Sequence, residues 1–502
     1  MKLDKRDKIH IAIIILGIIF VGIPVFHTSL WFDECYSVAI CNHTFKEIWT
    51  IGAHDVHPVL YYLVLHIINL IFGNNILMYR LFSYVCICIM GILGFTHIRK
   101  DFGKITGILF SFFSLFLPIM VVYAGEIRMY SLAMLLVTIM CIYAYRIYKN
   151  QGKIQIKNWI IFGVCSLASA YTHYYGLMTA GIVNVILFIY FLIKCIKQKK
   201  FTTEMKSFII SAVIQIAIYI PWIVNLLWQM NQVSHTFWIE IKPDILLEFL
   251  TFQFTGNLNN NIIINKWLAL SFSIVICTVL IYASIKNRTK KDVKDREYIN
   301  LIKLSLAIYF GIIIAATLMS LIMFRPIIYA RYMLCVTGVF IFFLSYYLSK
   351  NWNKYIITVI CILCIAMSIF IEVILCKQNY DPNNNPPFDY LKESVKENDI
   401  ILCSTQGSGF IVSANFPDNF LYFWDASSWN VEEAYKAFGK HMKTIYSLDE
   451  IADVKGRIWI IDAGTDELLN KVQDRFDITV LEKKNFSTAY HLYQYSFALV
   501  EK

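Results

Sequence analysis

The sequence predicts a polytopic α-helical membrane protein of about eleven transmembrane helices with a C-terminal extracytoplasmic α/β domain. Of its 502 residues, 58% are hydrophobic and only 16% are charged, and the mean hydropathy is +0.57. Soluble domains are about half apolar and a quarter charged, so most of this chain must lie in lipid. Long apolar runs alternate with short basic loops as far as residue 376, and residues 377–502 have the composition of a soluble domain.

Twelve stretches are apolar enough to be candidate membrane helices, and the basic loops between them test which ones cross. The candidates are residues 9–27, 58–73, 80–98, 105–124, 128–148, 158–172, 176–195, 207–228, 262–285, 302–324, 331–349 and 354–376. The basic segments are the N-terminus, Arg99–Lys104, Lys149–Lys157, Lys194–Lys206, Lys286–Lys303 and Lys350–Lys354. If all candidates crossed, these segments could not all be cytoplasmic, so one early stretch does not span.

The stretch that does not cross is residues 58–73, which is short, begins at His57 and Pro58 and is followed at once by Gly73-Asn74-Asn75. We predict that it is an amphipathic juxtamembrane helix within a first outer loop of residues 28–79. The transmembrane domain then covers residues 1–376, with the N-terminus in the cytoplasm. The soluble domain lies outside the cell, and the protein is a multi-pass protein of the plasma membrane.

The C-terminal segment opens with a linker rich in Pro and Asn at residues 381–387. Strand-like and helix-like runs then alternate, which predicts a small α/β domain. The expected strands are Asp399–Cys403, Arg457–Asp462, Ile478–Leu481 and Tyr490–Phe497. The expected helices are Phe388–Glu397, Val431–His441 and Thr465–Arg475.

Two adjacent carboxylates, Asp33 and Glu34, follow the first membrane helix. Burying them without a task or a partner at a membrane surface would cost several kcal/mol. A carboxylate in this place could act as a general base that takes the proton of an attacking hydroxyl. The structural alternative is helix capping or a salt bridge to Arg80 or Arg128.

Histidine and arginine residues mark the predicted outer side. His54 and His57 flank Asp55, a pattern that is weak evidence for a metal site and more often a set of hydrogen-bonding residues. His57 could instead donate to a phosphate oxygen. Arg128 lies at a membrane boundary, where its guanidinium can reach the interface or grip an anion. Arginines on this side oppose the usual bias, which predicts an anionic ligand such as a lipid phosphate or pyrophosphate; they are Arg80, Arg128, Arg325 and Arg331.

Aromatic residues gather at the same boundary around Tyr130, His173 and Tyr174. They suit an aromatic belt at the membrane interface or a wall on which a sugar ring stacks. The 13 cysteines are scattered mostly through apolar runs and indicate neither a disulfide framework nor a zinc site. The net charge of +10 comes from the basic loops that set orientation, so nucleic acid is excluded as a partner.

Taken together, these motifs resemble the GT-C integral-membrane glycosyltransferases of the protein O-mannosyltransferase and aminoarabinose transferase superfamily. In that family an Asp-Glu pair follows the first membrane helix, as Asp33-Glu34 does. A Pro-Pro-Leu or His-Pro-Pro-Leu motif opens a juxtamembrane helix, and His57–Leu60 matches it except for Val59. Gly73 and Arg80-Leu81 correspond to the next motif, and the loop Glu126–Tyr130 to an arginine-containing outer loop.

The resemblance implies transfer of a monosaccharide from a polyprenyl-phosphate donor to a hydroxyl acceptor on the outer face, with inversion at the anomeric carbon. Asp33 would be the base and Glu34 would orient Asp33 or the acceptor. The implied holders of the departing phosphate are Arg80, Arg128, Arg331 and His57, and the substrate contacts are Tyr130, His173 and Tyr174. No cofactor is obligatory, and a divalent metal stays open, with His54 and His57 as weak candidates.

Other readings compete with this one. A transporter or flippase of lipid-linked sugars would also be polytopic, but would carry its ionisable residues near the bilayer midplane and often show repeats. A glycan polymerase or ligase with a lipid-pyrophosphate donor would share the outward site. The acceptor could be a protein, a lipid or a cell-wall polymer.

Overall fold

The computed structural model describes residues 4–150, 155–235, 239–240, 245–255, 266–288, 296–350, 353–404, 406–416, 419–424, 436–439 and 441–502. Contacts divide these into two compact units. Unit 1 comprises Met1–Val25 and Leu81–Val373, and Unit 2 comprises Phe26–Arg80 and Ile374–Lys502. The first outer loop, which the sequence groups with the transmembrane domain, thus shares its contacts with the C-terminal segment.

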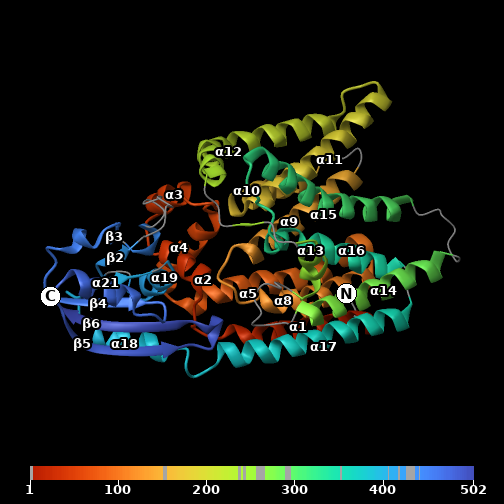
Figure 1. Cartoon of the computed structure of the whole chain (residues 1–502). Helices are drawn as coiled ribbons and strands as arrows, with labels where there is room; N and C mark the ends of the chain where they lie inside the picture. Colours follow the sequence, from red (N-terminus) through yellow and green to blue (C-terminus); the bar gives the residue numbers. More distant parts are fainter. Residues whose placement is uncertain are drawn as a thin grey trace. The chain divides into compact units, whose positions relative to one another are not determined.

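Helices make up Unit 1, and most of them are long and apolar (Figure 1). They are α1 (Lys5–Gly22), α5 (Ile76–Leu93), α6 (Arg99–Phe102), α7 (Lys104–Phe116), α8 (Pro118–Val122), α9 (Tyr130–Lys149), α10 (Ile156–Thr172), α11 (Tyr174–Gln198), α12 (Thr203–His235), α13 (Ile245–Thr255), α14 (Lys266–Arg288), α15 (Arg296–Met323), α16 (Thr337–Lys350) and α17 (Lys354–Asn379). Two helices cross a unit boundary: α5 begins in Unit 2, and α17 ends there.

Every stretch predicted to span the membrane coincides with one of these helices. In the described part of the chain, eight helical segments are long and apolar enough to cross by themselves. The stretch 105–124 is broken, because Pro118 holds Leu117 in an extended conformation and starts a new helix. The chain is a multi-pass membrane protein, as the sequence predicts.

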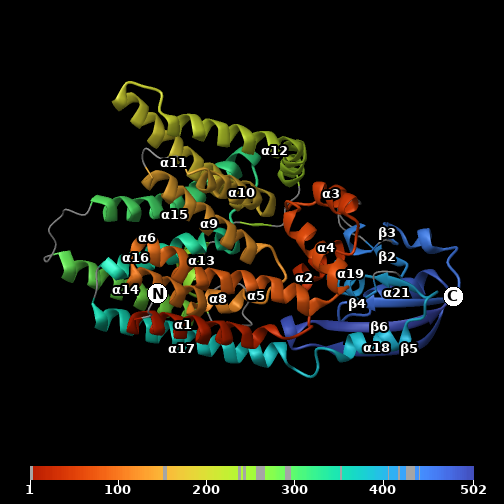
Figure 2. The same ribbon diagram turned by 180° about the vertical axis from the view of Figure 1, so that it is seen from behind.

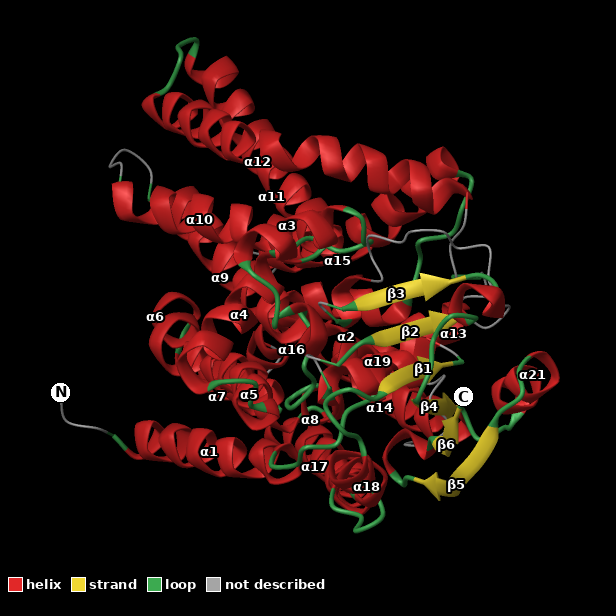
Figure 3. Cartoon of the chain, turned by 90° about the vertical axis from the view of Figure 1, so that its left-hand side faces the viewer, coloured by secondary structure: helices red, strands yellow, loops and turns green. Residues whose placement is uncertain are grey.

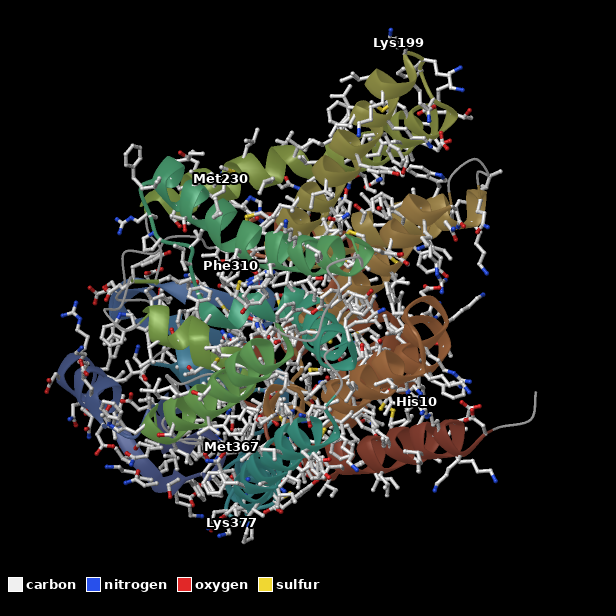
Figure 4. The ribbon with its side chains drawn as sticks, turned by 90° about the vertical axis from the view of Figure 1, so that its right-hand side faces the viewer. His10, Lys199, Met230, Phe310, Met367 and Lys377 are labelled. Atoms are coloured by element: carbon white, nitrogen blue, oxygen red, sulfur yellow. The ribbon has the colours of Figure 1, made fainter. Side chains whose placement is uncertain are left out.

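Packing in Unit 1 separates central from peripheral helices. In the most apolar stretch of α16 and the turn before it, 72% of the residues are buried. In α12 the corresponding share is only 17%, so its apolar side chains point outward, as in a lipid-facing helix. Helix α10 packs against α9, α11 and α12. The turn that joins α11 to α12 is found in Figure 4 at the label of Lys199.

Small residues permit a close helix contact in Unit 1. A π-helical turn, η2 (Gly94–Ile98), extends α5 and packs against α7. A Cβ atom at Gly94 would lie 2.7 Å from the Gly107 carbonyl oxygen and 2.9 Å from the Ser111 nitrogen, so only glycine fits there. The Ser111 hydroxyl lies 2.7 Å from Nε2 of His10, labelled in Figure 4, and thereby links α7 to α1.

Unit 2 contains a six-stranded sheet in the order β3-β2-β1-β4-β6-β5 (Figures 2 and 3). The strands are β1 (Ile400–Cys403), β2 (Leu421–Trp424), β3 (Met442–Ile445), β4 (Arg457–Asp462), β5 (Thr479–Ser487) and β6 (Gln494–Glu501). The first four strands are parallel, and β6 runs antiparallel to both β4 and β5. The helices of this unit are α2 (Phe32–Ile40), α3 (Phe45–Ala53), α4 (Leu60–Phe72), α18 (Pro386–Ser394), α19 (Gln406–Asn415) and α21 (Glu467–Arg475).

The structure confirms the α/β class of the C-terminal segment and corrects some of its elements. The sequence does not predict strands β2 and β3 or helix α19. The two strands have four residues each, and such short strands carry little periodic signal. The predicted strand Tyr490–Phe497 is wrong at its start, where a 3₁₀ turn (Tyr490–Leu492) precedes β6. Most of the predicted helix Val431–His441 lies outside the described residues.

A buried carboxylate ties the parallel strands together. Asp399 is 4% exposed and accepts hydrogen bonds from Arg457 Nε at 2.9 Å, Arg457 Nη2 at 3.1 Å and Trp459 Nε1 at 2.9 Å. Burial alone would raise the pKa of Asp399, but the bonds from Arg457, Lys396 and Trp459 outweigh it and lower that pKa. The carboxylate is therefore charged at neutral pH.

Helix α4 coincides with the stretch 58–73, which the sequence predicts to be a juxtamembrane helix. It has 13 residues, which at 1.5 Å per residue gives about 20 Å, less than the ~30 Å thickness of a hydrocarbon core. Its Tyr61, Tyr62 and Leu65 are buried, whereas Leu70 and Ile71 are each 66% exposed. This division into a packed and an exposed apolar side suits a helix that rests on a membrane without crossing it.

Candidate active site

The predicted carboxylates begin helix α2. Asp33 and Glu34 occupy its first turn, and the Glu34 carboxylate accepts the Trp31 backbone N–H at 3.4 Å. The N-terminus of a helix carries partial positive charge, so both positions favour a negative side chain. The two neighbours differ in access, because Glu34 is fully buried and Asp33 is partly exposed.

Arg80 holds Glu34 through a bidentate pair. Arg80 Nη1 donates to Glu34 Oε1 at 2.6 Å and Nη2 to Oε2 at 2.9 Å. The remaining donors of the guanidinium reach the backbone carbonyls of His27, at 3.1 Å from Nε, and of Ser29. Arg80 is 1% exposed. Glu34 therefore takes the structural role that the sequence leaves open, helix capping together with a salt bridge to Arg80. Arg80 directs its donors to Glu34 and to backbone carbonyls, so this geometry does not support its predicted phosphate-binding role.

Tyr490, at the turn between β5 and β6, also binds this carboxylate. Its hydroxyl donates to Glu34 Oε2 at 3.1 Å, across 456 positions of sequence. The ring of His27 lies 5.1 Å from the Tyr490 ring, centroid to centroid. Burial lowers the pKa of His27 far below its usual value, and the nearby Arg80 lowers it further, so this imidazole is neutral. Glu34 is thus neutralised by one arginine and oriented by one tyrosine.

The same turn fixes the start of α2 through two further residues, His491 and Tyr493. The His491 ring stacks on the Trp31 indole, with centroids 4.8 Å apart and planes 2° from parallel. The Phe32 backbone N–H donates to the Tyr493 hydroxyl at 3.0 Å. His491 has a φ of +54°, a left-handed conformation that costs a non-glycine residue about 1 to 2 kcal/mol. Sequence reasoning missed these contacts, since nothing local links residues 490–493 to Trp31.

The histidine motif lies in the same unit. His57 Nδ1 is 3.4 Å from Asp55 Oδ2, and His57 is partly buried. His54 Nδ1 instead contacts the Thr50 carbonyl oxygen at 2.8 Å. Among the described residues no group of three or more His, Cys, Asp or Glu side chains could hold a metal ion.

A second cluster, in Unit 1, is built around Arg331. Arg331 Nη1 lies 3.9 Å from Glu126 Oε1, and the guanidinium covers the rings of Tyr130 and Tyr329, each 5.4 Å from the centroid. Tyr130 is 2% exposed and Arg331 is 8% exposed. Arg128 is 5% exposed, and its backbone N–H donates to the Glu126 carbonyl at 2.8 Å. Arg331 is thus held by Glu126 and two tyrosine rings, and the buried Arg128 lies two residues along the chain from Glu126.

His173 and Tyr174 border the second cluster. The Tyr175 N–H donates to His173 Nδ1 at 3.0 Å, which caps α11 and leaves the proton of the neutral ring on Nε2. The His173 ring is 5.7 Å from that of Tyr130. Tyr174 is held by the Gln229 carboxamide and accepts the Trp222 indole N–H at 3.2 Å. His173 thus joins Tyr130, whereas Tyr174 belongs to a separate set of hydrogen bonds.

Comparison with known proteins bears on the fold of the chain. Residues 56–225 match the model of the dolichyl-phosphate-mannose-protein mannosyltransferase family. The crystal structure of ArnT from Cupriavidus metallidurans in the apo state superposes with a TM-score of 0.61 at 9% identity, covering 98% of this chain and 97% of that one. The chain has the GT-C fold.

Two other GT-C structures superpose less closely. ArnT bound to undecaprenyl phosphate gives a TM-score of 0.45 at 9% identity, over 98% of this chain and 97% of that one. The mycobacterial arabinofuranosyltransferase AftD gives 0.45 at 11% identity, with 98% of this chain and 40% of that one covered. A comparison with curated proteins found no match. The GT-C assignment confirms the fold that the Asp33-Glu34 and His57–Leu60 motifs predict.

Proposed function

We propose that this GT-C protein is a membrane glycosyltransferase that moves a monosaccharide from a polyprenyl-phosphate donor to a hydroxyl acceptor on the extracytoplasmic face. The observation that carries the proposal is the first turn of α2 on a GT-C scaffold. There Glu34 is fully buried and paired with Arg80, and its neighbour Asp33 is partly exposed. A paired, buried carboxylate cannot reach an acceptor, so the reactive carboxylate is Asp33.

In the proposed reaction Asp33 accepts the proton of the acceptor hydroxyl as its oxygen attacks the anomeric carbon. The new C–O bond forms as the bond between that carbon and the phosphate oxygen breaks, and polyprenyl phosphate leaves with the bonding electrons. Attack from the face opposite the phosphate inverts the anomeric carbon. General-base assistance of this kind contributes about 10²- to 10⁴-fold to a rate.

We assign the departing phosphate to the cluster around Arg128 and Arg331. Both guanidiniums are at least nine-tenths buried, where an anion is attracted more strongly than in water. Arginine also matches the bidentate geometry of phosphate oxygens. His173 and Tyr130 lie beside Arg331 and would contact the sugar, and His57 stays a candidate phosphate donor.

Glu34 and Arg80 act as positioning residues in this proposal. The pair fixes the start of α2. It thereby fixes the direction of Asp33, which precedes Glu34 by one residue. Tyr490, His491 and Tyr493 hold the same turn from the β5–β6 connection. The C-terminal segment therefore supports the candidate base, whatever acceptor it also recognises.

The test follows release of polyprenyl phosphate by purified wild type, Asp33→Asn and Asp389→Asn. Each variant is supplied with a panel of radiolabelled polyprenyl-phosphate sugars and with membrane extract as the source of acceptors. Asp389 is a matched control, since it also stands in the first turn of a helix, α18, but is exposed. We expect Asp33→Asn to lose about 10²- to 10⁴-fold in rate and Asp389→Asn to keep wild-type activity.

If wild type turns over and Asp33→Asn is equally active, the base is another residue. If no donor turns over while lipid-linked sugar crosses proteoliposome membranes, the protein is a transporter and the proposal fails.

A further inference from the structure

Unit 1 contains a cavity of about 510 Å³ between α9, α11, α15 and α16. These four helices contact one another in a ring, α9 with α11, α11 with α15, α15 with α16 and α16 with α9. Phe102 and Phe110, next to them, complete the wall. The volume falls within the range of about 300 to 1,000 Å³ that small-molecule sites occupy. None of the candidate active-site residues lines it.

The cavity runs along the helices rather than across them. On α9 its lining extends from Thr138 to Tyr148, and on α15 from Glu297 to Ile308. At 1.5 Å per residue these stretches are about 15 Å long. Figure 4 shows α15, on which Phe310 is labelled two residues beyond Ile308. The result is a slot parallel to the membrane helices.

One part of the slot is apolar, and the end near Tyr145 and Glu297 is charged. Ile142, Val183 and Val339 are among the aliphatic side chains of the wall. At the other end the Tyr145 hydroxyl donates to Glu297 Oε1 at 3.0 Å, and the Lys149 ammonium binds the same carboxylate. Apolar cavities hold water poorly and can accept an apolar ligand instead.

Lys303 lies about midway along the α15 lining, about 9 Å from Glu297, and makes the charged half of the slot attractive to an anion. It lines the slot and its side chain is exposed, whereas Lys149 and Glu297 largely neutralise each other. This end of α9 and α15 adjoins the basic segments Lys149–Lys157 and Lys286–Lys303, which the positive-inside rule places in the cytoplasm. The slot therefore faces the leaflet opposite the predicted chemistry, where anionic lipids are recognised by basic residues between helices.

We propose that this slot binds one hydrocarbon chain of an anionic membrane phospholipid, with the headgroup phosphate at Lys303 and the chain end near Thr138. The shape, the apolar wall and the single cationic mouth match a lipid with one charged end. The site is separate from the proposed glycosyl transfer, and the inference does not depend on that function.

The first test fills the slot. Ala307 lines it, and Ala307→Trp places an indole inside. Ala217→Trp is the matched control, because Ala217 is also exposed but lies on the peripheral helix α12. Each protein is purified in mild detergent, incubated with phosphatidylglycerol or phosphatidylcholine, and weighed by native mass spectrometry. We expect wild type and Ala217→Trp to retain one phosphatidylglycerol, and Ala307→Trp to bind it about tenfold more weakly or not at all.

The second test removes the charge and leaves the wall intact. Lys303→Gln should bind phosphatidylglycerol about fivefold more weakly and phosphatidylcholine as wild type does, since one basic residue near an anionic lipid contributes about that factor. Equal retention of both lipids by wild type, or retention unchanged by Ala307→Trp, would overturn the proposal.

Discussion

Replacing Arg80 by methionine would leave the Glu34 carboxylate buried without its cation. Both terminal nitrogens of Arg80 bind that carboxylate, at 2.6 and 2.9 Å, and neither side chain is more than 1% exposed. Methionine roughly keeps the length and the apolar stem of arginine. The Tyr490 hydroxyl, at 3.1 Å, would still donate to Glu34.

The expected cost is large, because the removal of one partner from a buried ion pair typically destabilises a protein by about 3 to 5 kcal/mol. Glu34→Gln/Arg80→Met removes both charges and leaves an amide that can still bind Tyr490. We expect the double variant to be more stable than Arg80→Met by at least about 1 kcal/mol, a coupling within the range seen for contacting residues. An additive result would mean that the two side chains do not interact.

The assay is reversible unfolding in mixed detergent micelles, followed by circular dichroism for wild type, both single variants and the double variant. The control is Arg475→Met, which breaks the pair with Asp449, in which both side chains are 58% exposed. Exposed pairs contribute about 0 to 1 kcal/mol. If Arg80→Met costs no more than Arg475→Met, Arg80 does not neutralise a buried carboxylate and its positioning role is refuted.

Three further predictions follow from single contacts. Tyr490→Phe should lower the glycosyl-transfer rate up to about tenfold while KM for the donor stays unchanged, because it removes one hydrogen bond to a charged group, worth about 1.5 kcal/mol; an unchanged rate would dismiss Tyr490 as a positioning residue. Asp399→Asn should destabilise the protein by about 1 to 3 kcal/mol at pH 7 in denaturant titration. The pKa of Asp399 is lowered, so its contribution is present above pH 3.8 and is lost as the pH falls through the native pKa; a difference between wild type and variant that does not shrink as the pH falls further below 3.8 would contradict this. Gly94→Ala should destabilise by about 1 to 3 kcal/mol, because its Cβ would collide with backbone of α7, whereas Gly181→Ala, with nothing within 4 Å, should be neutral in thermal unfolding; equal effects would refute the close packing.

Local patterns in the sequence predict much of the membrane part. Hydropathy locates the helices, and the basic loops single out residues 58–73 as a stretch that does not cross, which the structure makes the short helix α4. The Asp33-Glu34 pair can be recognised in the sequence because two carboxylates beside a membrane helix are costly unless they have a partner or a task. In the C-terminal segment, β4 coincides with the predicted Arg457–Asp462, since six residues of buried strand give a clear signal.

The predictions failed where the signal was short or the partners were distant. Strands β2 and β3 have four residues each, too few for a period to show. The turn at Tyr490 was read as strand because aromatic residues favour strands, although His491 adopts a left-handed conformation. The cluster of Arg331 with Glu126 and Tyr130 joins residues that are about 200 positions apart, and only packing brings them together.

The sequence by itself determined that this protein lies in a membrane and which residues are polar enough to need partners there. Hydrophobicity and helix propensity act over a few residues at a time, so they can be read along the chain. Only the tertiary structure decided that Glu34 takes Arg80 and Tyr490 as its partners and that Asp33 is the more accessible carboxylate. Which of two neighbouring carboxylates is desolvated depends on side chains 46 and 456 positions away, and their proximity is fixed by packing.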